Sequence, residues 1–156
     1  MDSKAIETIS VNAVRNSVVM SELLDQFKEP SWDGCVYIYG DKSKKKSSLK
    51  GRMPVQIKGK ICNDHPKKIA YSMSTADLKN YLNDGGCILF VVYIQKFDYS
   101  TTIYYAELTP IKLRNLLEKG KKQNTKTVHL KIFPSESNDK TTIFLNCLQN
   151  CQKQAS

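Results

Sequence analysis

Residues 51–59 read Gly-Arg-Met-Pro-Val-Gln-Ile-Lys-Gly, and they carry the pattern of a β-strand at the centre of the predicted fold. Apolar and polar side chains alternate from Val55 to Lys58, as they do in a β-strand, where successive side chains point to opposite faces of the sheet. A polar, lysine-rich loop at 40–51 separates this strand from the run Cys-Val-Tyr-Ile-Tyr at 35–39, which is rich in strand-forming residues. The two runs therefore predict a β-hairpin with a basic loop.

The chain on either side of this hairpin shows both helical and strand patterns. Apolar residues recur at spacings of three and four over 4–27, which predicts one amphipathic helix. Ser74 and Asp77 have the spacing of a helix start, with Ser74 as the cap. Residues 87–94 are apolar throughout, as expected of a central strand buried on both faces.

The predicted order is helix, three strands, helix, two strands, helix, strand, helix, which favours an α/β fold. The further strands are expected at 68–72, 101–108 and 127–133, and the further helices at 74–82, 110–119 and 143–148.

Length indicates the number of domains, and charge indicates the kind of partner. The chain has 156 residues, which is the length of one domain. Its 24 Lys and Arg residues exceed its 15 Asp and Glu residues by nine, so the formal net charge is +9. Such a charge favours polyanionic partners, nucleic acid or anionic lipid, and does not choose between them.

Targeting and redox signals point to the cytoplasm. The first residues lack the basic stretch and apolar segment of a secretory signal. The longest apolar run, 87–94, is far shorter than the roughly 20 residues that cross a bilayer, so no membrane partner is expected. Five cysteines without framework spacing suit reduced thiols. We therefore expect a soluble, cytoplasmic protein.

Three polar residues of the hairpin form the candidate site. Asp33 stands at the start of the first strand, while Gln56 and Lys58 are two residues apart on the second and so share a face. A carboxylate and an amide oxygen suit Mg²⁺, which needs only one or two protein oxygens when substrate phosphate completes its ligands. The alternative is that Gln56 and Lys58 form the solvent-facing side of an ordinary strand.

A family resemblance supports the first interpretation. Trp32-Asp33-Gly34, the lysine-rich loop and residues 51–59 resemble the D…QxK variant of the PD-(D/E)xK nuclease superfamily, in particular a prokaryotic nuclease-like family linked to phage defence. The resemblance covers about residues 5–133. It implies a restriction-endonuclease-like core, a mixed β-sheet flanked by helices, as a nuclease domain at 1–133. Residues 134–156 would then be a polar linker with a C-terminal helix and tail.

The resemblance also implies roles for single residues. Asp33 would be the metal-binding acid and Lys58 the catalytic lysine, with Mg²⁺ as cofactor and Mn²⁺ as its substitute. Gln56 stands where most members have Glu or Asp, so metal affinity should fall unless another carboxylate assists. Glu7 is the candidate for this third ligand, because it shares a helix face with Val11 and superfamily members often supply a glutamate from the first helix. The alternative for Glu7 is a boundary residue that reaches solvent.

Basic residues in and beside the loop are candidates for contacts to the nucleic-acid backbone, which are salt-dependent and carry little base specificity. They are Lys42, Lys44, Lys45, Lys46, Lys50 and Arg52. The alternative is a solvated loop without a partner.

These observations together predict a metal-dependent endonuclease that hydrolyses phosphodiester bonds in DNA, in preference to RNA, as a prokaryotic defence effector. A homodimer, or a sensor domain or partner protein, would fit such a role. The alternative is a nuclease-fold module with weak or no catalysis that binds nucleic acid or a partner protein, because the amide of Gln56 carries no negative charge.

Overall fold

The computed structural model describes residues 1–19, 24–28, 33–39, 49–63, 68–120 and 122–155. Its elements follow in the order α1 (Ser3–Val19), β1 (Leu24–Lys28), β2 (Asp33–Tyr39), β3 (Leu49–Cys62), β4 (Lys68–Ser74), α2 (Thr75–Asn83), β5 (Cys87–Gln95), β6 (Thr101–Leu108), α3 (Pro110–Glu118), β7 (Thr125–Ile132) and α4 (Ser137–Gln154).

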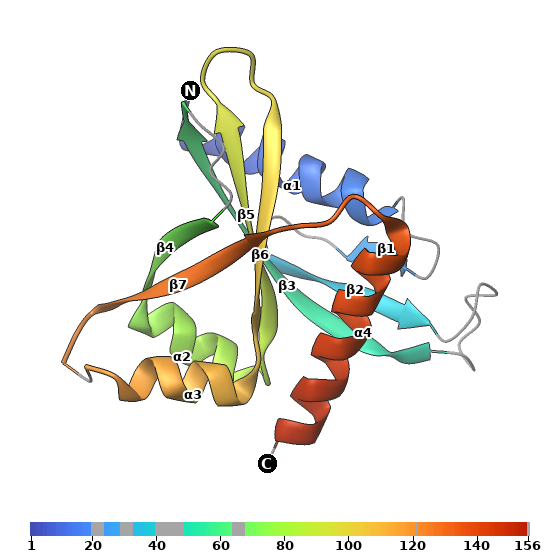
Figure 1. Ribbon diagram of the computed structural model, residues 1–156, viewed down its shortest axis with the longest axis vertical. Helices are drawn as coiled ribbons and strands as arrows, with labels where there is room; N and C mark the ends of the chain where they lie inside the picture. Colours follow the sequence, from blue (N-terminus) through green and yellow to red (C-terminus); the bar gives the residue numbers. More distant parts are fainter. Residues whose placement is uncertain (20–23, 29–32, 40–48, 64–67, 121, 156) are drawn as a thin grey trace.

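The described strands form one twisted sheet in the order β1-β2-β3-β5-β6-β7-β4 (Figure 1). Strands β3 and β5 are parallel, with α2 in the chain between them, and the other described pairs are antiparallel. The expectation of an α/β chain with a mixed sheet flanked by helices is therefore confirmed.

Two apolar clusters cover the two faces of the sheet. Helices α1 and α4 pack on one face and form the first cluster, which includes Val11, Phe144 and Ile57. Helices α2 and α3 pack on the other face and form the second cluster, which includes Leu78 and Leu113. Side chains of the sheet strands β4 and β7 that face these helices belong to the same cluster. Figure 1 shows α2 and α3 side by side, away from α1, and the backbone N–H of Ile111 in α3 donates a hydrogen bond of 2.9 Å to Oε1 of Gln154 in α4.

Strand β5 contributes to both clusters, because its side chains alternate between the faces. Ile88 and Phe90 belong to the first cluster, and Leu89 and Val91 belong to the second. All of Cys87–Ile94 is buried. The prediction of a central strand buried on both faces is confirmed, and this alternation also identifies the face on which each polar residue of β3 lies.

Helix α2 begins as predicted, with Ser74 as its N-cap. The backbone N–H of Asp77 donates a hydrogen bond of 3.1 Å to Oγ of Ser74, which is the N-cap. Such a bond satisfies one of the donors that the first turn of a helix leaves without a partner. Pro110 begins α3, as its fixed backbone torsion favours.

The prediction of one helix over 4–27 is wrong at its C-terminal end. Helix α1 ends at Val19, and residues 24–28 are strand β1, at the edge of the sheet. Leu24 pairs with Ile38 and Phe27 pairs with Val36, with a register shift between the two pairs. The extra residue of that bulge gives apolar positions a spacing of three, which resembles helical periodicity.

The C-terminal helix is longer than predicted. Helix α4 begins at Ser137, so the last four of the seven residues expected as a polar linker, 134–140, are helical. Phe144, Cys147 and Leu148 are buried in the first cluster. Residues 137–154 are therefore packed into the core that α1 covers, and Lys140 links the two helices by donating a hydrogen bond of 3.0 Å to the carbonyl oxygen of Ser17.

None of the helices in the described part of the chain combines the length and the apolar composition that crossing a bilayer needs.

Candidate functional site

The β2–β3 ladder brings two of the candidate residues together. The antiparallel register pairs Asp33 directly with Gln56. Cα atoms of directly paired residues in such a ladder lie about 4.5–5.5 Å apart. The proximity that the hairpin pattern predicted for Asp33 and Gln56 is thus present in the backbone.

Gln56 is buried, with 8% of its surface exposed. Its side-chain oxygen Oε1 accepts no hydrogen bond from any described residue. Because Gln56 pairs with Leu89 of β5, it lies on the face of the second cluster. A buried acceptor without a partner is costly, and in native structures it often marks a site for water, an ion or a ligand.

Lys58 lies two residues further along β3, paired with Val91, on the same face as Gln56. It is partly exposed. The cross-strand pair of Asp33 with Gln56 and the two-residue spacing of Gln56 and Lys58 thus place the three candidate residues on neighbouring backbone positions of β2 and β3.

Glu7 is not brought together with these residues. As predicted, it shares the side of α1 that carries Val11 and Val14, and it is partly buried. That side of α1 packs on the face of β3 that presents Val55 and Ile57. Because strand residues alternate, Gln56 and Lys58 point away from this face. The sheet therefore lies between Glu7 and the side chains of Gln56 and Lys58, and the structure does not bring Glu7 together with them.

The basic residues divide into two groups. Lys42, Lys44, Lys45 and Lys46 lie outside the described residues. Lys50 and Arg52 belong to the first residues of β3, and both are exposed.

Lys60, which the sequence analysis did not single out, extends this basic group. It is exposed at the other end of β3, and its Nζ lies 5.9 Å from the centroid of the Tyr93 ring. Arg52, Lys58 and Lys60 are all separated by even numbers of residues, so the three cations and Gln56 share one face of the strand. The alternation in 51–60 was the signal that could have identified Lys60.

A divalent cation fits this arrangement in one limited way. Among the described side chains, no group of three or more His, Cys, Asp or Glu is placed to hold a metal ion. Asp33 pairs with Gln56 in the backbone of the hairpin, and the amide oxygen of Gln56 is a buried acceptor without a hydrogen-bond partner in the described structure. Mg²⁺ accepts such oxygen donors when water and substrate phosphate supply the remaining ligands.

A second charged group lies on the opposite face, and the sequence analysis missed it. Glu107 on β6 is partly buried, and burial raises its pKa, while the positive charges of Lys112 and Lys131 act in the opposite direction. These three residues come from β6, α3 and β7. No local pattern could have revealed the group, because only the packing of three separate elements assembles it.

Comparison of the chain with models of known protein families, with curated proteins and with solved structures gives no match.

Proposed function

We propose that this protein is a metal-dependent endonuclease that hydrolyses phosphodiester bonds in DNA, on a restriction-endonuclease-like core. The observation that carries the proposal is the pairing of Asp33 with Gln56, whose amide oxygen is buried and has no hydrogen-bond partner among the described residues. Lys58 adds an ammonium group on the same face. The mixed sheet with helices on both faces supports the proposed core.

Each residue has a distinct task in this proposal. Asp33 and Gln56 would hold Mg²⁺, or Mn²⁺ in its place, and the bound ion would supply charge stabilisation at the phosphate and a more acidic water. Lys58 offsets negative charge on the phosphate and donates hydrogen bonds that orient the attacking water. Because Gln56 is neutral and Glu7 lies behind the sheet, one carboxylate of the proposed set carries charge, and we expect weak binding of the metal.

The basic residues of β3 support a nucleic-acid substrate. Arg52, Lys58 and Lys60 place three positive charges along one face of the strand, with Gln56 between them. A net charge of +9 adds a long-range attraction to a polyanion. Contacts of this kind bind phosphates irrespective of base sequence, so we expect cleavage with little sequence preference and binding that weakens as salt rises.

A second candidate function rests on the position of Glu7. With Glu7 on the other face of the sheet and an amide at Gln56, the same surface would bind nucleic acid or a partner protein without cutting. Loss of cleavage with retention of salt-sensitive DNA binding would favour this function.

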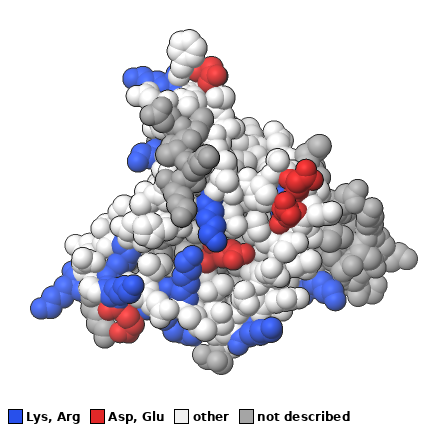
Figure 2. Space-filling view, in the orientation of Figure 1, with Lys and Arg blue, Asp and Glu red and all other residues white. Residues whose placement is uncertain are grey.

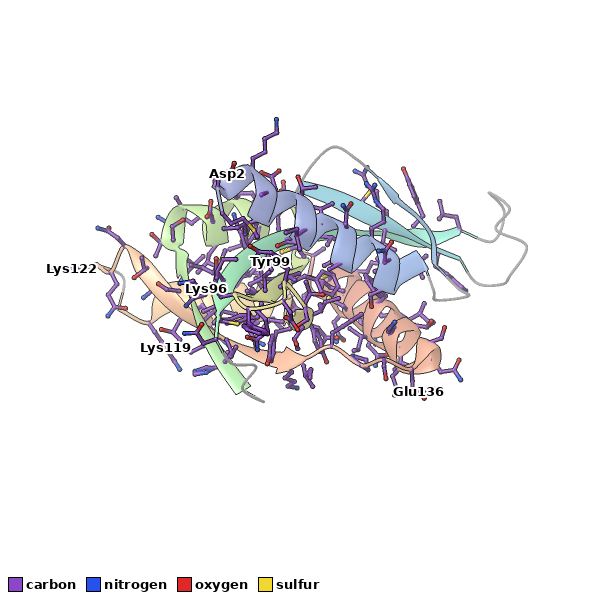
Figure 3. All side chains as sticks on the ribbon, turned by 90° about the horizontal axis from the view of Figure 1, so that it is seen from above. Asp2, Lys96, Tyr99, Lys119, Lys122 and Glu136 are labelled. Atoms are coloured by element: carbon purple, nitrogen blue, oxygen red, sulfur yellow. The ribbon has the colours of Figure 1, made fainter. Side chains whose placement is uncertain are left out.

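The test is cleavage of supercoiled plasmid by the purified chain with Mg²⁺, with Mn²⁺ and with EDTA. We expect nicking that needs the metal and falls by about 100-fold or more in Lys58→Ala, the size typical of a group that acts directly in proton transfer or charge stabilisation. Asp33→Ala should abolish nicking. Lys122→Ala is the control, because it removes the same charge from the turn between α3 and β7 (Figure 3).

Two further measurements make the result decisive. Far-ultraviolet circular dichroism verifies that each variant is folded, and fluorescence anisotropy with a labelled duplex in EDTA reports binding without cleavage. Nicking that survives in both site variants at the rate of the control would refute the proposed site.

A further inference from the structure

The turn between β5 and β6, residues 96–100, projects from the sheet and carries two aromatic side chains in solvent. Phe97 is 96% exposed and Tyr99 is 56% exposed. Figures 1 and 2 show this turn at the top of the molecule, and its tip is white in the space-filling view, with basic and acidic side chains beside it. Single exposed apolar residues are common on protein surfaces, but two aromatic rings within one five-residue turn are not explained in this way.

Hydrogen bonds order the backbone of the turn. The N–H of Tyr99 donates a bond of 2.9 Å to the carbonyl oxygen of Gln95, and the N–H of Gln95 donates one of 2.8 Å to that of Ser100. The N–H of Lys96 donates a bond of 3.0 Å to the carbonyl oxygen of Cys62, at the end of β3. An ordered backbone presents the two rings at a lower loss of entropy when a partner binds.

Tyr99 has a backbone conformation that its side chain disfavours. Its φ is 60°, in the left-handed region, and in the described part of the chain every other positive φ belongs to a glycine. A bulky side chain is unfavourable in this region, whereas Gly, Asn and Asp are accepted. The fold alone would favour Asn at this position, which points to a role of the Tyr99 ring outside the fold.

Positive charges connect this turn with the candidate site on β3. Lys60 is exposed two residues before Cys62, and Lys96 is exposed in the turn. Gln56 lies six residues before Cys62, which is about 20 Å along a strand. A nucleic-acid strand that lies on Lys58 and Lys60 can therefore extend from the candidate site to the turn.

We propose that the β5–β6 turn binds unpaired bases of a nucleic acid, which stack on Phe97 and Tyr99, while Lys60 and Lys96 contact phosphates of the same strand. Stacking on aromatic side chains tolerates any base, and it needs base faces that are not already stacked in a duplex. The proposal rests on the nucleic-acid substrate of the proposed function, but not on cleavage. It adds the class of substrate, a strand with a single-stranded segment.

An anionic membrane is the other surface that aromatic and basic residues bind. Asp98 lies between the two aromatic residues of the turn, and its Oδ1 accepts a hydrogen bond of 2.9 Å from the backbone N–H of Ser100. Asp98 is exposed. Insertion of the tip into a bilayer would take this carboxylate out of water, whereas bases that stack on the ring faces leave it hydrated. The turn therefore favours nucleic acid.

The test compares two fluorescein-labelled probes of equal length and charge, an oligothymidylate of about 15 nucleotides and a strand of abasic sites. Fluorescence anisotropy in EDTA measures binding to the full-length chain without metal-dependent cleavage. The oligothymidylate should bind at least tenfold more tightly than the abasic strand, by about 1.4 kcal/mol or more. Phe97→Ala and Tyr99→Asn should each weaken binding of the oligothymidylate about tenfold and leave binding of the abasic strand within about twofold.

Two controls separate stacking from folding and from charge. Because Asn suits the torsion at this position, Tyr99→Asn should unfold in urea at the same or a higher denaturant concentration than the original protein. Ile111→Ala removes an exposed apolar side chain from α3 and should leave both affinities unchanged. Lys60→Ala should weaken both probes by the same factor, because a phosphate contact does not read the bases.

Equal affinity of the original protein for the two probes would overturn the proposal, as would unchanged oligothymidylate binding in both Phe97→Ala and Tyr99→Asn. Binding to phosphatidylserine vesicles that is lost in Phe97→Ala, with unchanged oligothymidylate binding, would assign the turn to a membrane surface instead. The plasmid assay fails separately, because a protein that binds the oligothymidylate through this turn and does not nick plasmid would refute the nuclease site alone.

Discussion

At the scale of single residues, Gln56 has a property that stability alone does not favour. Its amide oxygen is buried, and no described residue donates a hydrogen bond to it. Leaving a buried acceptor unsatisfied costs about 1–3 kcal/mol of folding free energy. A site that must hold a ligand has a reason to keep such an atom, whereas a strand that serves only the fold does not.

A substitution at Gln56 separates these two roles. Gln56→Met has a similar length and no polar atom, so we expect it to raise the free energy of unfolding by about 1 kcal/mol. The same variant should lose metal-dependent nicking, because it removes an oxygen ligand. Urea denaturation measures the first effect and the plasmid assay measures the second. A less stable Gln56→Met would show that the amide oxygen is hydrogen-bonded in the folded protein.

Glu107 leads to a prediction about pH. Burial raises its folded-state pKa above the usual value of 4.5, so the folded protein holds this proton more tightly than the unfolded chain. The resulting stabilisation is fully present below pH 4.5 and is lost as the pH rises through the raised pKa. In Glu107→Gln this loss should be absent, because the amide does not titrate.

Urea unfolding of both proteins from about pH 4 to about pH 8 tests this linkage. The free energy of unfolding of Glu107→Gln should increase relative to that of the original protein as the pH rises through this range. A difference between the two proteins that stays constant with pH would contradict the prediction.

At the scale of elements, the contact between α1 and β3 depends on a glycine. A Cβ atom added at Gly59 would overlap with Oγ of Ser10 and lie 2.7 Å from Cγ2 of Ile6, both on α1. Glycine is therefore required here for the close approach of helix and strand, and not for an unusual backbone torsion. The same contact lies on the Val55 and Ile57 face of β3, which is the face opposite to Gln56.

Gly59→Ala should destabilise the protein by about 1–3 kcal/mol, the usual cost of overpacking in a well-packed core. Ser10→Ala removes the nearest obstructing atom, so the double variant should recover part of this loss. The two single variants and the double variant form a cycle that is measured by urea denaturation. Additive effects of the two substitutions would contradict a direct clash between these residues.

At the scale of the whole molecule, the sheet separates two cores, and segments distant in the sequence complete each of them. Helix α4 adds Phe144 and Leu148 to the cluster that α1 begins. Strands β4 and β7 pair along their length, although 50 residues separate Ser74 from Thr125, the pair at one end of their ladder. The candidate hairpin residues lie on β2 and β3, whereas the charged group of Glu107, Lys112 and Lys131 comes from β6, α3 and β7, towards the other end of the sheet.

Most elements could be predicted because their signals are local. The apolar run at 87–94, the Ser74 cap and the Pro110 start each depend on neighbouring residues, and the structure contains all three features. Strand β1 could not be predicted, because a bulge gives its apolar residues the spacing of a helix. Only the pairing with β2 distinguishes a strand from a helix at these residues.

The same distinction applies to the candidate site and to the group around Glu107. Local sequence was enough to predict that Asp33 could pair with Gln56 and that Lys58 shares the face of Gln56, since alternation along a strand and a short hairpin are local properties. Tertiary packing, in contrast, places Glu7 on the other face of the sheet from Gln56 and brings Lys112 and Lys131 near Glu107. The face of a sheet on which a helix packs depends on contacts among all the elements, so no single segment encodes it.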